Sequence, residues 1–341
     1  DHRDLHSCPT RRSSDLVVEP IMPKQIFTNQ QLTKFSASEI IDHLIYHNYS
    51  LLKTLGAERM RLNMVPIGKV CHFVSAYFYK TTGPKNNEEE HIKNAQRKIL
   101  RKLQFMAPAR YNASKFPKQL QNGLVIGFNH PSLGEILRLV ALKLDLMGEK
   151  PMLFPVNLPW YEAIAPDYEI LKKLGVIITP TITPTTWQKL HLKEHTSLYQ
   201  SAFKLKRDFR ELYTELSYQT IQAGGIIFVA PSATRQATVF KSQAVYEKTT
   251  EIIPTMSILA LKLLKDSETK CDFLPLAVLP PKKSTRGLNL FKTYQLRPAP
   301  LITSRQIRQR YFKNSNLKRL DNFDYDFHLQ IAQQLPKKFW Y

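Results

Sequence analysis

Hydrophobic residues recur with a helical period in the first third of the chain. Ser36 and Glu39 have the spacing of a capping box, and apolar residues follow them at helical intervals. A second stretch, from Ile92 to Met106, places apolar residues three or four positions apart beneath a strongly basic outer face. The pattern predicts a helical N-terminal domain over residues 17–115, packed on the part of the chain that follows.

The pattern changes near Pro117, where short apolar runs begin to alternate with amphipathic stretches, which is typical of an α/β domain. We therefore assign residues 116–341 to such a domain. The predicted helices are Leu133–Leu146 and a longer one that contains Phe209 and ends at Gly224. The predicted strands are Leu124–Phe128, Val176–Thr179, Ile226–Ala230, Phe273–Leu279 and, as an edge strand, Phe291–Leu296.

Composition narrows the class of protein. Of 341 residues, 43% are hydrophobic, which excludes a disordered or collagen-like chain. The apolar runs are far shorter than the roughly 18 residues that a membrane-spanning helix needs. The chain has 49 Lys and Arg against 28 Asp and Glu, a formal net charge of +21. Such a surface favours anionic partners: nucleic acid, phospholipid headgroups or phosphorylated substrates.

The cysteines and the first residues carry little chemistry. Cys8, Cys71 and Cys271 show neither a CxxC spacing nor a metal-ligand pattern, so we expect no metal site, no structural disulfide and a reducing compartment. Residues 1–16, DHRDLHSCPTRRSSDL, read like a translated sequencing adapter. We treat them as an artefact that contributes nothing to the fold, and the alternative is a genuine polar N-terminal tail.

The first candidate site follows the predicted strand that ends at Phe128. His130 and Pro131 come directly before the predicted helix, and Glu135 falls within about its first turn, where Pro131 suits the first helical position. A carboxylate there can fold back to one imidazole nitrogen and leave the other as a general base. The alternative is a histidine that caps the helix, with Glu135 merely favourable to the helix dipole.

The second candidate site follows the strand that ends at Ala230, where Pro231, two hydroxyl groups and an arginine come in succession. The guanidinium of Arg235 presents paired donors that match a phosphate, and the hydroxyls of Ser232 and Thr234 can complete the set. The alternative is an ordinary surface turn with a solvated Arg235.

Together the two sites resemble the glycerolipid acyltransferase family, which carries a His-x4-Asp box followed by a second box that ends in arginine. Among its members, the soluble plastid-type glycerol-3-phosphate acyltransferases are the most similar, because their second box, Ala-Pro-Ser-Gly-Gly-Arg, resembles residues 230–235, Ala-Pro-Ser-Ala-Thr-Arg. Residues 273–281, Phe-Leu-Pro-Leu-Ala-Val-Leu-Pro-Pro, also resemble a proline-terminated strand of that family. The resemblance covers roughly residues 120–300 and implies a helical domain before a mixed-sheet α/β domain.

The chain departs from the family pattern at three places. Glu135 stands where the family has aspartate, and Ser232-Ala233 stands where Glu-Gly is commoner. The middle box, residues 175–181, lacks its usual basic residue, and Lys189 and Lys193 follow later as the candidates to supply that charge.

The resemblance implies an O-acyltransferase of phospholipid biosynthesis that needs no cofactor beyond acyl-CoA or acyl carrier protein as co-substrate. His130 with Glu135 would activate the hydroxyl of glycerol 3-phosphate or lysophosphatidate. Arg235, aided by Ser232, Thr234, Lys189 and Lys193, would hold the phosphate. The expected location is the cytoplasm, or the plastid stroma of a plant or alga, peripherally bound to an anionic membrane.

Two other functions stay open at this point. An inactive protein could keep the acyltransferase fold to bind lipid, which the missing charge of the middle box favours. A basic nucleic-acid-binding protein is the other class, but the sequence has no helix-turn-helix, zinc-ligand or RNP-like motif, so we expect no nucleic acid as partner.

Overall fold

The computed structural model divides the chain into two compact units, Asp1–Leu44 and Ile45–Tyr341. All the residues that the structure describes lie in the second unit. The described residues begin at residue 88, so the adapter-like residues 1–16 and the predicted helices before residue 88 lie outside them. The structure describes residues 88–117, 122–131, 134–148, 150–157, 175–181, 197–231, 255–265, 268–281, 289–312 and 317–337.

The centre of the second unit is a mixed sheet of seven strands in the order β1-β7-β6-β2-β5-β3-β4. Neighbouring strands are parallel except β6 and β7, which are antiparallel. This confirms the α/β class. The strands are β1 (Ala109–Arg110), β2 (Gly123–Phe128), β3 (Met152–Asn157), β4 (Val176–Thr181), β5 (Ile226–Val229), β6 (Cys271–Leu279) and β7 (Tyr294–Pro298).

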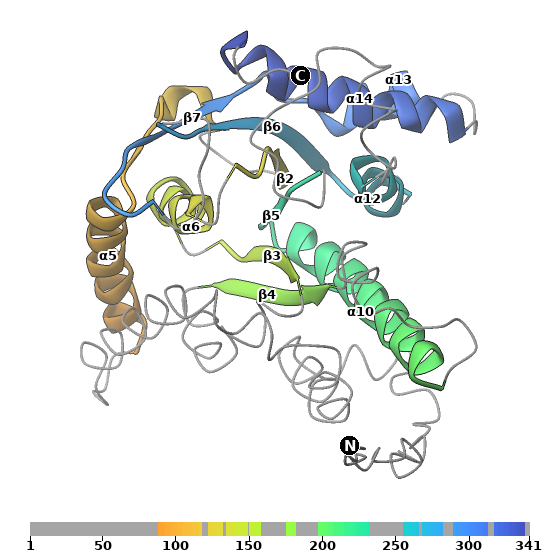
Figure 1. Ribbon diagram of the computed structural model, residues 1–341, viewed down its shortest axis with the longest axis horizontal. Helices are drawn as coiled ribbons and strands as arrows, with labels where there is room; N and C mark the ends of the chain where they lie inside the picture. The colour runs from red at the N-terminus through yellow and green to blue at the C-terminus, as the bar shows by residue number, and fades with distance from the viewer. Residues whose placement is uncertain are drawn as a thin grey trace, which may run out of the picture. The chain divides into compact units, whose positions relative to one another are not determined.

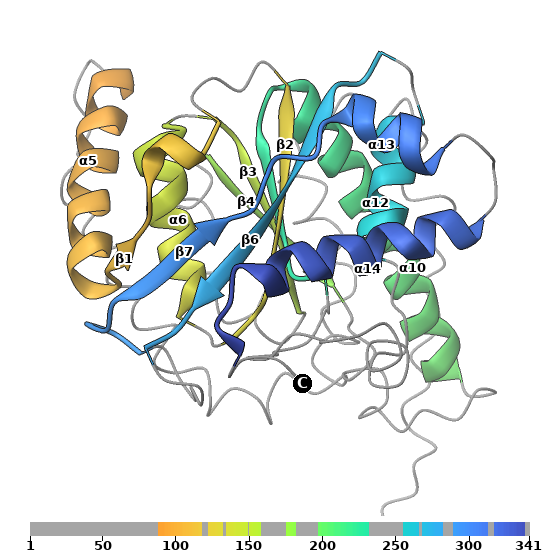
Figure 2. The same cartoon turned by 90° about the horizontal axis from the view of Figure 1, so that it is seen from above.

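Helices cover both faces of this sheet (Figure 1). One face carries α6 with α5 beside it, whereas α10, α12, α13 and α14 lie on the opposite face (Figure 2). The helices are α5 (Glu88–Met106), α6 (Glu135–Leu146), α10 (Ser197–Gln222), α12 (Thr255–Leu264), α13 (Ser304–Tyr311) and α14 (Leu317–Gln333), with a short 3-10 turn at Ala113–Lys115.

The core lies where the central strands meet these helices. All residues of β2 and β5 are buried, as expected for parallel strands covered on both faces. On α10 the side chains of Phe209, Leu212 and Leu216 are buried at the spacing that the sequence predicted. Ile99 and Leu103 of α5 are buried in the same way, so the predicted apolar stripe of this helix is confirmed over its described part.

Two sequence-based expectations are corrected. The strand predicted at Phe291–Leu296 is β7, which begins at Tyr294 and is not an edge strand because β1 pairs with its outer side. Phe291 has φ 61°, a left-handed conformation that lies outside the extended region of regular strands. Helix α6 begins at Glu135, with Gly134 as its N-cap, so Pro131 precedes the helix. Helix α5 and strand β1, which belong to the predicted N-terminal domain, contact helix α6 and strand β7.

Gly127 of β2 marks a close approach between the sheet and α14. A Cβ atom at this position would lie 2.4 Å from Cε1 of the fully buried Phe327. We expect Gly127→Ala to lower the free energy of unfolding by about 1–3 kcal/mol, because the ring would be forced from its packed position. Urea denaturation measures this loss. The cost should shrink when Phe327→Leu is also present, and an unchanged stability for Gly127→Ala alone would contradict the prediction.

Candidate functional site

The predicted pair of His130 and Glu135 is in contact. Nδ1 of His130 donates a hydrogen bond to Oε1 of Glu135, the first residue of α6. The carboxylate is fully buried, whereas the imidazole side chain is 20% exposed. The histidine therefore stands between a buried acid and the solvent, with its tautomer fixed by the acid, so that Nε2 is the nitrogen suited to accept a proton.

Asn129 determines where the chain leaves the sheet. Its side-chain amide donates to the main-chain oxygen of Val278 over 2.9 Å, and the main-chain N–H of Val278 donates to Oδ1 of Asn129 over 2.7 Å. β2 pairs with β6 up to Phe128 and Leu276, so this amide continues the ladder by side-chain contacts. The clamp fixes the position of His130 at the carboxyl end of β2. Sequence reasoning missed this role, although an asparagine directly after an apolar strand was its available signal.

A cluster of aromatic side chains in the sheet contacts the imidazole of His130. The ring of Phe128 contacts His130 edge to face, with 6.3 Å between ring centroids. Phe128 also packs with Phe154 of β3 and Phe228 of β5, at centroid distances of 6.0 and 6.5 Å. All three phenylalanines are buried. His130 of the His130–Glu135 pair, called the dyad from here on, thus contacts a buried apolar layer made by three neighbouring strands.

Arg138, one turn along α6 from Glu135, is fully buried and bound to main-chain oxygens. Its planar guanidinium lies over the ring of Tyr294, with the central carbon 3.8 Å from the ring centroid. Burial lowers the pKa of Arg138 to about 10, and the electrostatic effects of Tyr294 and Glu135 act in the opposite direction. The guanidinium therefore stays charged at neutral pH. Its acceptors are the oxygens of Gly134 (2.6 Å), Pro108 (3.3 Å), Asn289 (2.9 Å) and Lys292 (2.7 Å).

The second candidate site begins on the strand next to the dyad. β5 is parallel to β2, with Val229 opposite Gly127, so the two strands end at the same edge of the sheet. Neighbouring strands are about 4.8 Å apart. The chain after β5 therefore starts beside His130, and the structure describes it as far as Pro231. Ser232, Thr234 and Arg235 lie outside the described residues, as do Lys189 and Lys193.

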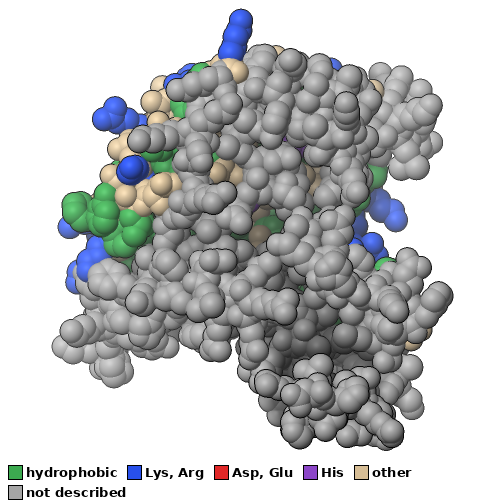
Figure 3. All heavy atoms as spheres, viewed as in Figure 1, with side chains coloured by type: hydrophobic (Ala, Val, Ile, Leu, Met, Phe, Trp, Pro, Cys, Tyr) green, Lys and Arg blue, Asp and Glu red, His purple; other side chains and the backbone are tan. Residues whose placement is uncertain are grey.

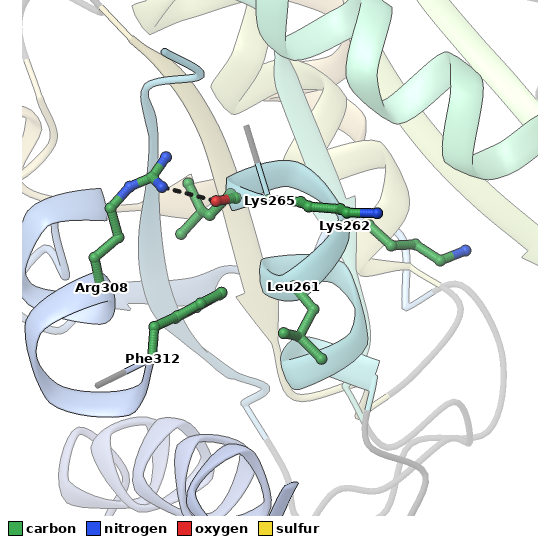
Figure 4. Close-up of a pocket in the computed structure, with 6 residues that line it drawn as sticks. Leu261, Lys262, Lys265, Arg308 and Phe312 are labelled. Carbon is green, nitrogen blue, oxygen red and sulfur yellow. Dashed lines mark hydrogen bonds between the residues drawn. The ribbon is translucent and has the colours of Figure 1, made fainter. Parts of the chain in front are cut away.

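A separate hollow of about 580 Å³ lies between α12 and α13 (Figure 4). Arg308 lines it and donates to the main-chain oxygens of Leu264 (2.8 Å) and Thr269 (3.1 Å), just before β6 begins. Its other lining residues include Lys262, Lys265 and Phe312. Because the six-residue β2 is about 20 Å long, this hollow is remote from the dyad.

The described residues hold neither a membrane-spanning helix nor a cluster of metal-ligating side chains. In the ranges that the structure describes, no helix is long and apolar enough to cross a membrane. Within the same ranges, no three His, Cys, Asp or Glu side chains are grouped closely enough to hold a metal ion. Cys271 of β6 is a free buried thiol, and burial raises its pKa well above the usual value.

Comparison with known proteins adds no assignment. No family model matches the chain, and no curated protein matches it at a significant level. The interpretation of the site therefore depends on its own geometry.

Proposed function

We propose that the protein is an O-acyltransferase that moves a fatty acyl group from an acyl thioester to the hydroxyl of a phosphorylated glycerol. The donor is acyl-CoA or acyl carrier protein, and the acceptor is glycerol 3-phosphate or lysophosphatidate. The single observation that carries this proposal is the contact between His130 and the buried Glu135 at the carboxyl end of β2.

The dyad has the chemistry of a general base. A buried carboxylate that accepts a hydrogen bond from Nδ1 orients the imidazole and stabilises its protonated form. This is the role of the acid beside the histidine in a catalytic triad. Exposure of the imidazole on its outer side gives a hydroxyl group access to the ring. A histidine that merely caps a helix would instead bond to main-chain N–H groups of that helix.

The proposed reaction has two proton transfers. Nε2 of His130 takes the proton of the acceptor hydroxyl while its oxygen attacks the thioester carbonyl carbon. The tetrahedral intermediate then collapses, the carbon–sulfur bond breaks, and the imidazolium returns the proton to the leaving thiolate. The products are an ester and a free thiol, without a covalent enzyme intermediate.

The acceptor phosphate is assigned to the segment after β5. Arg235, Ser232 and Thr234 follow Pro231 directly, and β5 ends at the edge where the dyad lies. A clamp there would hold the phosphate so that the hydroxyl reaches His130, and positioning of this kind lowers the barrier. Lys189 and Lys193 are further candidates for that charge. The net charge of +21 agrees with a peripheral site on an anionic membrane, in the cytoplasm or a plastid stroma.

Acyl transfer is tested by offering the purified protein labelled acyl-CoA or acyl carrier protein with three acceptors: glycerol 3-phosphate, lysophosphatidate and glycerol. We expect a labelled ester with at least one phosphorylated acceptor, and little with glycerol, which lacks the phosphate. Separation of the lipid products measures this. Equal use of glycerol and glycerol 3-phosphate would contradict the proposed binding of the phosphate by Arg235. Absence of transfer from every donor would favour the alternative of an inactive lipid-binding protein.

A further inference from the structure

Two aromatic side chains near the dyad are exposed to solvent and contact each other. Phe105, in the last turn of α5, is 74% exposed, and Phe291, in the loop before β7, is 61% exposed. They are the two most exposed large hydrophobic residues in the described part of the chain. Their rings pack edge to face with centroids 5.6 Å apart. Paired apolar rings at a surface are typical of a binding site.

The fold holds Phe291 in this outward position. Its φ of 61° is a left-handed conformation that costs free energy for a side chain of this size. The main-chain N–H of Phe291 donates to the oxygen of Met106 over 2.6 Å. On either side of it, the oxygens of Asn289 and Lys292 accept from the buried Arg138. These bonds fix the loop and so keep the strained conformation.

Basic side chains surround the two rings. Lys98 and Arg101 precede Phe105 by seven and four positions on α5, so they share its helical face, and both are exposed. Lys292, next to Phe291, is also exposed. We call these five residues the Phe105–Phe291 patch. Figure 3 shows hydrophobic side chains beside Lys and Arg side chains at the edge of the molecule where α5 lies.

Charge of one sign extends beyond the patch. From residue 91 to residue 110 the chain has six Lys and Arg and no Asp or Glu. The acidic residues of α5, Glu88–Glu90, occupy its opposite end, more than about 20 Å along the helix from Phe105. The patch therefore combines an apolar centre with positive charge, the chemistry that matches an anionic lipid surface.

The patch lies at the edge of the sheet that carries the dyad. β7 runs antiparallel to β6, so the loop before β7 is at the carboxyl end of β6 and β2. Arg138 connects the two places, because it follows Glu135 by three positions and binds the oxygens on both sides of Phe291. A lipid bound at the patch would meet the molecule on the side where His130 opens to solvent.

We propose that the Phe105–Phe291 patch is the surface by which the protein docks on an anionic phospholipid bilayer. The two phenyl rings enter the interfacial layer, and Lys98, Arg101 and Lys292 contact the headgroups. The rings carry no hydrogen-bonding atom, so a bilayer, which offers an apolar layer beneath negative charge, suits them better than the polar surface of an acidic protein. The inference rests on the proposed function for its purpose, which is delivery of a membrane substrate to His130.

Vesicle sedimentation tests the docking surface. The full chain is mixed with phosphatidylcholine vesicles, with or without phosphatidylglycerol, at low and high salt. We expect strong binding only to the anionic vesicles, weakening with salt. Phe105→Ala with Phe291→Ala should weaken that binding about 10-fold or more, because the two rings that enter the bilayer are lost. Lys98→Gln with Arg101→Gln should weaken it by about 30-fold and reduce its salt dependence.

Phe203→Ala is the matched control, because Phe203 is 55% exposed on α10, outside the patch. This variant should bind vesicles like the unaltered protein, and thermal melts confirm that each variant is folded. Acyl transfer from a short-chain acyl-CoA to glycerol 3-phosphate is measured in parallel without vesicles. If acyl transfer is absent with every donor and with both phosphorylated acceptors while the patch variants lose vesicle binding, the proposed function fails and the docking surface stands.

Two results would overturn the docking proposal while acyl transfer persists. One is patch variants that bind anionic vesicles as tightly as the unaltered protein. The other is patch variants that keep vesicle binding and lose binding to acyl carrier protein, which would assign the surface to an acidic protein.

Discussion

His130→Ala is expected to lower kcat for acyl transfer by about 100-fold or more, because positioned proton transfer typically contributes 10²- to 10⁴-fold. The melting temperature should change little, since the imidazole is partly exposed at the end of a strand and carries little of the core. Initial rates at saturating donor and acceptor give kcat, and a thermal melt checks the fold. If His130→Ala keeps full turnover with a verified substrate, the mechanism proposed here is wrong.

Variants of Glu135 complete this test. Glu135→Gln keeps the shape but loses the negative charge that stabilises the imidazolium, so we expect a smaller loss of kcat than for His130→Ala. Glu135→Asp shortens the side chain by one methylene on a fixed helix and should also reduce activity. The losses from His130 and Glu135 should not add, because both residues serve one proton transfer. Additive losses would mean that Glu135 acts elsewhere.

Arg138→Met is expected to lower the free energy of unfolding by about 3–5 kcal/mol, because it leaves several main-chain oxygens without their charged donor in a buried place. Arg138→Lys should recover only part of this loss, since one ammonium group cannot reach acceptors spread around a planar guanidinium. Urea denaturation measures the free energy of unfolding of both variants, and the slope of this free energy against urea concentration should be unchanged.

Arg297→Met provides the matched control for that experiment. Arg297 lies on β7, the strand that begins with Tyr294, but its side chain is exposed. Substitution of a surface residue of this kind changes stability by no more than about 0.5 kcal/mol. If Arg138→Met were no more destabilising than Arg297→Met, Arg138 would not join α6 to the loop before β7 in solution.

Short-range patterns were sufficient for the elements that bury one continuous face. β2, β5 and β6 are apolar runs bounded by turn residues, and α10 repeats its apolar residues with a helical period, so their positions followed from the sequence. The contact between His130 and Glu135 was also predictable, because it joins residues five positions apart across a strand-to-helix turn. Whether the pair acts in catalysis stays a prediction.

Long-range contacts could not be predicted in this way. Arg138 binds oxygens 151 and 154 positions away, and Asn129 pairs with Val278 across 149 positions. Neither contact leaves a periodic trace in the sequence. β3 was missed because Pro155 interrupts its pattern, although that residue lies beyond the part of the strand paired with β5. The conformation of Phe291 contradicts its local preference and results from the bonds around it.

The contacts of Arg138 also bear on the order in which the chain folds. α6 is synthesised early, but the oxygens of Asn289 and Lys292 that compensate its buried charge leave the ribosome some 150 residues later. Until then, burial of the first turn of α6 would leave a guanidinium short of acceptors, which is unfavourable. The contacts of Arg138 are therefore completed late in biosynthesis, and a chain that stops before residue 289 contains both members of the dyad but lacks two of the oxygens that bind Arg138.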